Sequence, residues 1–323
     1  MVERIPIPDL SAEPVERTAG RSILEASVAN VDGTVILATR TRLVAIDADG
    51  TLNELLGTEQ GKPIHDVFIG DSGDVAFVKR VGGKELVQLV TDGERQAGER
   101  RDASFVQDDV FTIDQTGTRI ATAHTKRGRG GERSLRIYDV DRSKEPVATI
   151  PLGERELHQV EFNRQGNAVA YRTIPAESAD GRDTIGLLSR NPDGTYRSVY
   201  EQSLPRPIEF VAFIPGGRSI IAREDDGDFV TYSLDGGGPK RIKTDSLGID
   251  EIESFDFSPD GTLLAVADQE RIAVLSVPAL CEERALRVVA DREHKDVTTV
   301  SFGVTGELLI GERGGTARVY AAA

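Results

Sequence analysis

A short turn that ends in glycine recurs seven times along this chain of 323 residues, each time between two apolar, strand-like segments. The turn glycines are Gly33, Gly73, Gly117, Gly166, Gly217, Gly261 and Gly306. A spacing of about 40 to 50 residues, with room for four strands in each repeat, is typical of a β-propeller. Alternating apolar residues mark the strands, and clusters of Gly, Asp and Pro mark the turns between them. The sequence therefore predicts an all-β fold, a seven-bladed β-propeller of four-stranded blades.

The repeat divides a single predicted domain, residues 1–323, into seven blades. They are expected at roughly 20–59, 60–99, 104–152, 155–201, 206–245, 250–291 and 295–323. The last blade has only three strand-like segments, and the stretch 3–10 offers the missing outer strand. Pro6 and Pro8 are tolerable there because an outermost strand leaves one edge unpaired. Such pairing would close the ring and cover a bare sheet edge; a frayed terminal tail is the alternative.

Composition narrows the classes of function. The formal net charge of −15 argues against general attraction to nucleic acid or to anionic membranes. No apolar run reaches the roughly 18 residues of a membrane span, so no membrane insertion is expected. Cys281 is the only cysteine, which excludes an internal disulfide, and the first residues lack the apolar core of a signal peptide. We expect an acidic, monomeric, cytoplasmic protein.

Several segments resemble the WD-repeat family. The stretch FDFSPDGTLLAVAD, residues 255–268, is similar to the inner strand, tight turn and second strand of that repeat. SLRIYDV, residues 134–140, resembles the third strand that ends in Trp-Asp, with Tyr138 and Asp139 in those places, and Tyr320 takes the aromatic position in GGTARVYA. The chain contains no tryptophan, and no repeat has the family's complete His–Asp–Ser/Thr–Trp set. The resemblance implies a propeller that holds other proteins on its rims and sides rather than a catalyst.

Three of the four histidines stand at the start of an inner strand. His65, His158 and His294 could converge to bind a metal or transfer protons. They fall in blades two, four and seven, too far apart around a ring for one ion, so we expect each to tie down a loop by a ring hydrogen bond. Cys281 has no activating partner in the sequence, and no glycine-rich phosphate loop lies between a strand and a helix. We predict no catalytic residue, no cofactor and no metal site.

Basic residues cluster on one predicted rim. The loop between the second and third strands of blade three leaves the rim at which that blade's first strand begins. The cluster comprises Arg100, Arg101, Lys126, Arg127, Arg129 and Arg133. Acidic loops of blades four and five, residues 177–183 and 224–228, are expected on the same rim. Such a face suits a protein partner with an acidic or phosphorylated segment, gripped by arginine forks; a merely solvated hairpin is the alternative.

Two other functions stay open from the sequence. A small-molecule enzyme of the lactonase-like propeller type would need a site in the central channel. Its titratable candidates on the inner strands are Asp66, Glu161, Glu209, Glu253 and Asp256. A periplasmic carrier resembling the TolB propeller would need the export signal that the first residues lack. The expectation that we carry forward is a protein-interaction platform.

Overall fold

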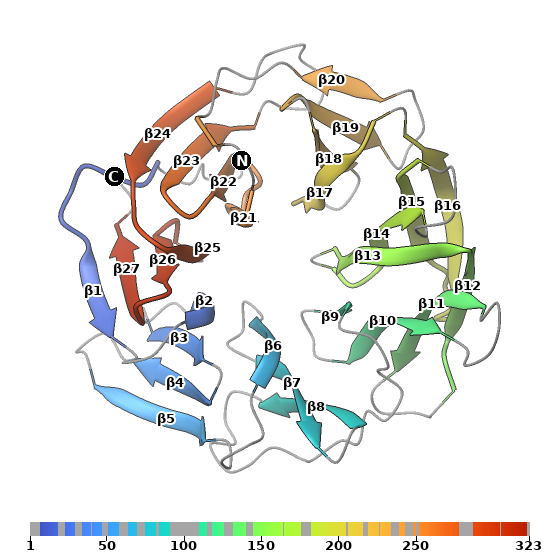
Figure 1. Ribbon diagram of the computed structural model, residues 1–323, viewed down its shortest axis with the longest axis horizontal. Coiled ribbons are helices and arrows are strands. Elements are labelled where there is room, and N and C mark those ends of the chain that lie inside the picture. Colours follow the sequence, from blue (N-terminus) through green and yellow to red (C-terminus); the bar gives the residue numbers. More distant parts are fainter. Residues whose placement is uncertain are drawn as a thin grey trace. The chain divides into compact units, whose positions relative to one another are not determined.

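The structure, a computed structural model, describes the greater part of the chain between Ile7 and Ala321 (Figure 1). The residues outside this description are 1–6, 19–22, 30–33, 40, 47–50, 58–63, 70–74, 82–83, 91–109, 115–117, 126–131, 140–144, 164, 176–181, 205, 216–218, 226, 234–238, 243–247, 250–251, 278–286, 304 and 322–323. For residues 18, 24–29, 55–57, 64–69, 75–81, 84–90 and 287–291 the backbone alone is described.

The described residues form seven antiparallel sheets and no helix; six sheets have four strands and one has three. The chain divides into two compact units. Unit 1 comprises Met1–Val81, Gln88–Arg100 and Ile242–Ala323, and unit 2 comprises Gly82–Val87 and Arg101–Arg241. Within the part that the structure describes, no helix is long and apolar enough to cross a bilayer.

Unit 1 is built on the sheets β2-β3-β4-β5, β21-β22-β23-β24 and β1-β27-β26-β25. Their strands are β1 (Val15–Thr18), β2 (Ile23–Ala29), β3 (Thr34–Thr39), β4 (Arg42–Ile46), β5 (Leu52–Gly57), β21 (Ser254–Phe257), β22 (Leu263–Ala267), β23 (Arg271–Ser276), β24 (Arg287–Glu293), β25 (Val297–Phe302), β26 (Leu308–Glu312) and β27 (Thr316–Tyr320). The three-stranded sheet has β6 (Ile64–Ile69), β7 (Val75–Val81) and β8 (Lys84–Val90).

Unit 2 is built on the sheets β12-β11-β10-β9, β13-β14-β15-β16 and β17-β18-β19-β20. Their strands are β9 (Phe111–Ile113), β10 (Arg119–Thr125), β11 (Arg133–Asp139), β12 (Ala148–Gly153), β13 (Arg155–Phe162), β14 (Ala168–Pro175), β15 (Thr184–Arg190), β16 (Tyr196–Ser203), β17 (Ile208–Ile214), β18 (Ser219–Glu224), β19 (Phe229–Ser233) and β20 (Lys240–Ile242). Consecutive strands pair as neighbours in every four-stranded sheet except the one that contains β1.

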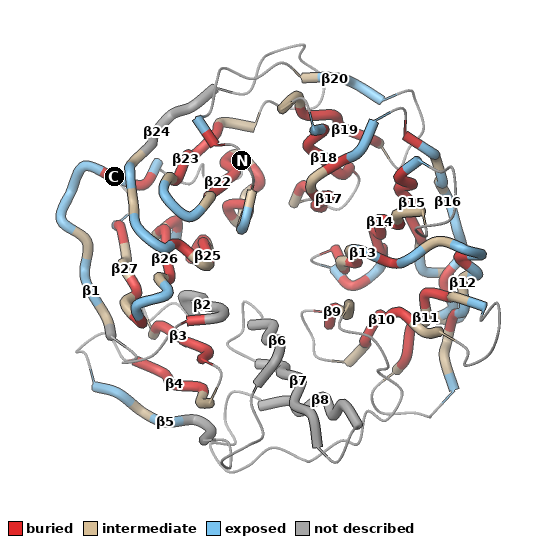
Figure 2. Tube along the Cα trace, in the orientation of Figure 1, coloured by how far each residue is buried: buried red, intermediate tan, exposed pale blue. Residues whose placement is uncertain are grey.

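In the four-stranded sheets, the middle strands carry most of the buried residues that the structure describes (Figure 2). All six residues of β18 and all five of β22 are buried. The outer strand β16 instead has one buried residue, and its other residues are half-buried or exposed. In unit 2, Leu135 and Ile137 pack with Val169 and Tyr171 in one apolar cluster between two sheets. The repeated sheets are therefore held together by apolar faces pressed against each other.

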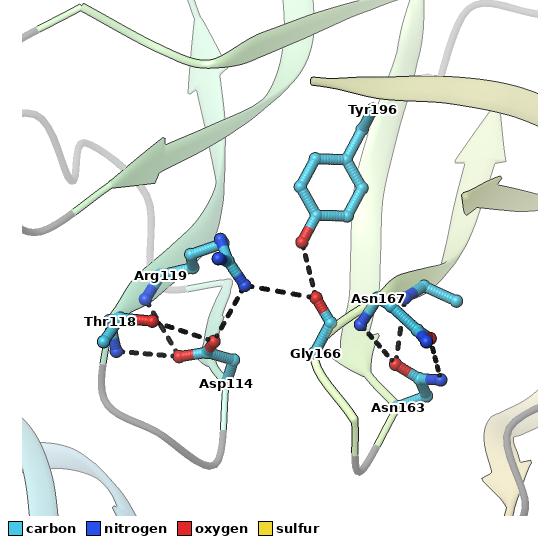
Figure 3. Close-up of polar contacts among 8 residues, drawn as sticks. Asp114, Thr118, Arg119, Asn163, Gly166, Asn167 and Tyr196 are labelled. Atoms are coloured by element: carbon cyan, nitrogen blue, oxygen red, sulfur yellow. Dashed lines mark hydrogen bonds and ion pairs between the residues drawn. The ribbon is translucent and has the colours of Figure 1, made fainter. Parts of the chain in front are cut away.

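A polar side chain at the first turn position fixes the recurring glycine turn. Asp114 Oδ1 accepts hydrogen bonds from the backbone N–H groups of Thr118 at 2.8 Å and Arg119 at 2.9 Å (Figure 3). Asn163 Oδ1 does the same for Asn167 and Ala168, both at 2.9 Å. In a third copy, Ser258 Oγ accepts from the N–H of Leu263 at 2.9 Å. Each side chain satisfies N–H groups that the tight turn leaves without a ladder partner.

Glycine at the fourth turn position has a backbone reason. Gly166, Gly261 and Gly306 have φ angles of +62°, +71° and +100°, a region that residues with a side chain rarely adopt. The other four turn glycines lie outside the described residues. At these three turns, the positive φ angle explains why glycine recurs at the same position of the repeat.

Single side chains extend the hydrogen-bond ladder from one inner strand to the next. In unit 2, Gln159 of β13 donates from Nε2 to the carbonyl of Val211 at 2.7 Å and accepts from its N–H at 2.9 Å. In unit 1, Asp256 Oδ2 on β21 accepts from the N–H of Phe302 on β25 at 2.7 Å. These contacts fix neighbouring sheets in register near their inner edges.

The last sheet is completed by the N-terminal region, but at a different place from the one predicted. Strand β1, residues 15–18, pairs with β27 from Val15↔Val319 to Thr18↔Thr316, whereas the sequence indicated 3–10. Every residue of β1 has an N–H group to offer a ladder, which Pro6 and Pro8 lack. Within the predicted stretch, Leu10 instead buries its side chain among the core residues of this sheet and its neighbour, with 4% of its surface exposed.

Candidate functional site

Of the six basic residues predicted to form a site, the structure describes one. Arg133 begins β11, with its Nη2 2.6 Å from Glu156 Oε1 and its Nη1 donating to the carbonyl of Glu154 at 3.1 Å. Its side chain keeps 28% of its surface exposed. Arg100, Arg101, Lys126, Arg127 and Arg129 lie outside the described residues. Arg133 therefore ties β11 to the start of β13 while part of its side chain stays exposed to solvent.

Other arginines lie at the same ends of the unit 2 strands. Because the strands are antiparallel, the start of β11 lies beside the end of β12, and the chain passes there directly into β13. The end of β14 and the start of β15 share that edge in the next sheet. We call this edge the arginine rim, defined by Arg133, Arg155, Arg172, Arg223 and Arg241.

Arg172 and Asp183 form a buried ion pair on this rim. The Nη2 of Arg172 lies 2.9 Å from Asp183 Oδ2, its Nε donates to the same oxygen at 3.1 Å, and the two side chains are 10% and 8% exposed. Asp183 Oδ2 also accepts from the N–H of Ile208 at 3.1 Å. The carboxylate thus holds the first residue of β17 as well as Arg172.

The network continues through Glu209 into the next sheet. Arg172 Nη1 donates to the carbonyl of Glu209 at 2.9 Å, and the Glu209 carboxylate is 2.7 Å from Nη1 of Arg223. Arg172 and Arg223 occupy corresponding positions on the second strands of their sheets, opposite Gln159 and Phe210. Two buried guanidinium groups are therefore linked through one glutamate.

Arg241 extends the rim toward solvent. It pairs with the buried carboxylate of Glu224 and, at 2.9 Å, with Asp228, while 40% of its own side chain is exposed. The hydrogen bond that Arg241 donates to Asp228, together with the nearby charges of both acids, raises the pKa of Arg241. Asp183, Glu224 and Asp228 all belong to the predicted acidic loops, and the structure pairs each of them with an arginine. The acidic sector expected on this rim is thus largely neutralised where it is described.

The histidines show the structural role that was expected for them in one described case. His294 Nδ1 lies 3.0 Å from Glu312 Oε1, and its Nε2 lies 2.9 Å from the hydroxyl of Tyr320. Burial lowers the pKa of His294. His158 lies at a bulge of β13 and is exposed. Partial desolvation is the main cause that lowers the pKa of His158, and the positive charge of Arg172 lowers it further. The side chain of His65 lies outside the description, and the described residues contain no group of three His, Cys, Asp or Glu side chains that could hold a metal ion.

The inner-strand carboxylates proposed for a channel site have protein partners where they are described. Glu209 pairs with Arg223, and Asp256 binds the N–H of Phe302 and the hydroxyl of Ser301. Glu253 accepts from Gln269 Nε2 at 2.9 Å. Glu161 also has a protein interaction, and the side chain of Asp66 lies outside the description.

Sequence reasoning missed Arg172 and Arg223 because it looked for charges in loops. Both arginines stand inside apolar strands, in AVAYRTIP and SIIARE. A single arginine in an otherwise apolar central strand is itself a signal, because a buried charge requires a partner close by. Applied to both strands, that rule would have drawn attention to Asp183 and Glu209.

Comparison with known proteins supports the fold. No family model matches the chain, and no curated protein matches its sequence. Among solved structures, a chain of the structure titled "Crystal Structure of Mitotic Checkpoint Complex" is similar over 100% of this chain and 99% of its own, with a TM-score of 0.66 and 12% sequence identity. At that identity the likeness shows the fold alone: a β-propeller of antiparallel sheets.

Proposed function

We propose that this chain is a seven-bladed β-propeller, closed by its N-terminal strand, that works as a non-catalytic platform for protein partners. The observation that carries the proposal is the likeness over the full chain to a propeller in a multiprotein complex. The segments that resemble the WD-repeat family point the same way. A monomeric, cytoplasmic protein remains our expectation from its acidic composition and single cysteine.

The partner contact that we propose is the arginine rim together with the basic loop beside it. Arg133 supports this choice, because it follows residues 126–131 closely in the chain and part of its side chain is exposed. Lys126, Arg127 and Arg129 in that loop, with Arg100 and Arg101, complete the proposed surface. Its chemistry favours an acidic or phosphorylated segment, since arginine forks bind carboxylate and phosphate through two parallel hydrogen bonds.

The proposal is tested by reversing the loop charges while keeping Arg133, whose pair with Glu156 holds two strands together. We expect the triple variant Lys126→Glu, Arg127→Glu and Arg129→Glu to lose binding to immobilised polyglutamate and phosphoserine peptides, and to lose the partners that the wild-type chain captures from its native cell. Binding is measured at two salt concentrations, because attraction between exposed charges weakens with screening.

A matched control reverses Arg190 and Arg197, two exposed basic residues of unit 2 at the ends of their strands that lie opposite the rim, and is compared with the double variant Arg127→Glu and Arg129→Glu. This control changes net charge by the same amount as that double variant and should leave binding intact. Equal loss in both double variants would mean that net charge alone drives the contact. Undiminished binding of the loop variant, with an unchanged melting curve, would remove the proposed surface.

A further inference from the structure

Two arginines hold the N-terminal segment that leads into β1, the strand that pairs with β27. Arg292 Nη1 donates to the carbonyls of Leu10 at 2.6 Å and Ala12 at 3.1 Å. Arg318 on β27 pairs with Glu16 of β1. We call residues 7–18 the N-terminal clasp. The clasp is held in place by the buried side chain of Leu10, by the pairing of β1 with β27 and by these two arginines.

Both arginines also lie beside His294. Arg318 Nε is 2.8 Å from the same Glu312 oxygen that His294 contacts. The guanidinium carbon of Arg292 is 5.3 Å from the centre of the Tyr320 ring, whose hydroxyl bonds to the other nitrogen of His294. The His294 side chain is 6% exposed. One buried imidazole therefore touches the partners of both clasp arginines.

The hydrogen bonds suit a neutral imidazole. Glu312 is a carboxylate that only accepts, so Nδ1 of His294 must donate to it, and Nε2 then accepts from the Tyr320 hydroxyl. A second proton on the ring turns Nε2 into a donor, and the buried Tyr320 hydroxyl loses its acceptor. The added charge also faces Arg318 and Arg292, and the described carboxylates that contact these groups are Glu312 and Glu16.

We propose that the N-terminal clasp is a pH-sensitive device, in which protonation of His294 loosens the grip of Arg292 and Arg318 on residues 7–18. The sign follows from linkage. Burial lowers the pKa of His294, Arg318 and Arg292 lower it further, and Glu312 opposes them. The released state, with the site open to water, binds the proton more readily. The closed clasp is therefore fully favoured above the ordinary histidine pKa of about 6.5 and is weakened as the pH falls below that value.

Hydrogen–deuterium exchange of the full chain at pH 7.5, 6.5 and 5.5, corrected for the pH dependence of intrinsic exchange, tests the device. We expect protection of residues 7–18 to fall by up to about tenfold per pH unit below about pH 6.5, the limit for one proton. Protection of β14 in unit 2 should stay constant and serves as the internal reference. In His294→Gln, whose neutral amide can donate to Glu312 and accept from Tyr320, the dependence should vanish. His158→Gln, a change at an exposed histidine of unit 2, should retain it.

Unchanged protection of residues 7–18 in the wild-type chain, or the same dependence in His294→Gln, overturns the proposal. Reciprocity gives a second measurement that does not need the glutamine variant to fold. Leu10→Ala weakens the clasp, so it should raise the titration midpoint of the His294 ring measured by NMR in the full chain. A midpoint equal to that of the wild-type chain would also overturn the proposal.

Discussion

Removal of the Asp183 carboxylate tests whether the arginine rim contributes to the stability of unit 2. Asp183→Ala deprives Arg172 of two contacts to one oxygen, at 2.9 and 3.1 Å, and leaves the N–H of Ile208 without its acceptor. Arg172 keeps its bond to the Glu209 carbonyl, so part of its hydrogen bonding survives.

The magnitude follows from burial. Both side chains of the Arg172–Asp183 pair are at most 10% exposed, and breaking a buried pair from one side costs about 3–5 kcal/mol because the remaining charge is left uncompensated. Asp228→Ala removes an ion pair of comparable length, 2.9 Å, from Arg241. In this pair, however, the side chain of Asp228 is 29% exposed and that of Arg241 is 40% exposed. For that exposed pair we expect a loss of about 1 kcal/mol or less.

The assay is urea denaturation followed by circular dichroism, because the chain has no tryptophan to report by fluorescence. The double variant Arg172→Met with Asp183→Ala removes both charges and should recover part of the loss seen in Asp183→Ala alone. A loss for Asp183→Ala no larger than that for Asp228→Ala would refute the reasoning. So would a double variant whose loss equals the sum of the losses measured separately for Arg172→Met and Asp183→Ala.

Two further predictions concern Tyr171 and its neighbours. A methyl group at Gly186 would lie 1.9 Å from Cζ of Tyr171, so Gly186→Ala must displace a buried ring and should destabilise the chain by about 1–3 kcal/mol. The control Gly314→Ala, which has open space at its Cβ, should leave the melting temperature unchanged. Equal melting temperatures of the two variants would contradict this prediction. Burial raises the pKa of Tyr171 and of Tyr232, so the stability that the neutral phenols contribute is complete below the ordinary tyrosine pKa of about 10 and is lost as the pH rises beyond it. Phenolate absorbance should then show at least two tyrosines that ionise only as the chain unfolds in alkali, and ionisation of all six tyrosines before unfolding would contradict the burial.

The repeat made the sheets predictable, because strand alternation and turn chemistry are local. FDFSPDGTLLAVAD was expected to give an inner strand, a turn and a second strand, and it does, as β21 and β22 around the Ser258 turn. The N-terminal strand was placed too early, because the apolar residues of 3–10 were given more weight than the N–H groups that Pro6 and Pro8 lack. Only pairing with residues 316–319 selects it.

The rim was harder to predict because its partners come from different sheets. Asp183 meets Arg172 across the loop that joins β14 to β15, and Arg172 then reaches the backbone of β17. Sequence spacing does not show which strand ends lie close together. The expectation of an acidic sector counted the carboxylates of the loops, of which Asp183, Glu224 and Asp228 do lie at this edge, but not the strand arginines that pair with them.

The pairing of β1 with β27 also constrains the order in which the chain can fold. Glu16 and Arg318, the ion pair of that sheet, are 302 residues apart. During synthesis β1 emerges long before β27, so this sheet cannot be completed until residues 316–320 have been made. Contacts of such long range are slow to form, and domains that need them expose unpaired strand edges in the meantime. We therefore expect the N-terminal segment to be the last part of unit 1 to acquire protection during refolding.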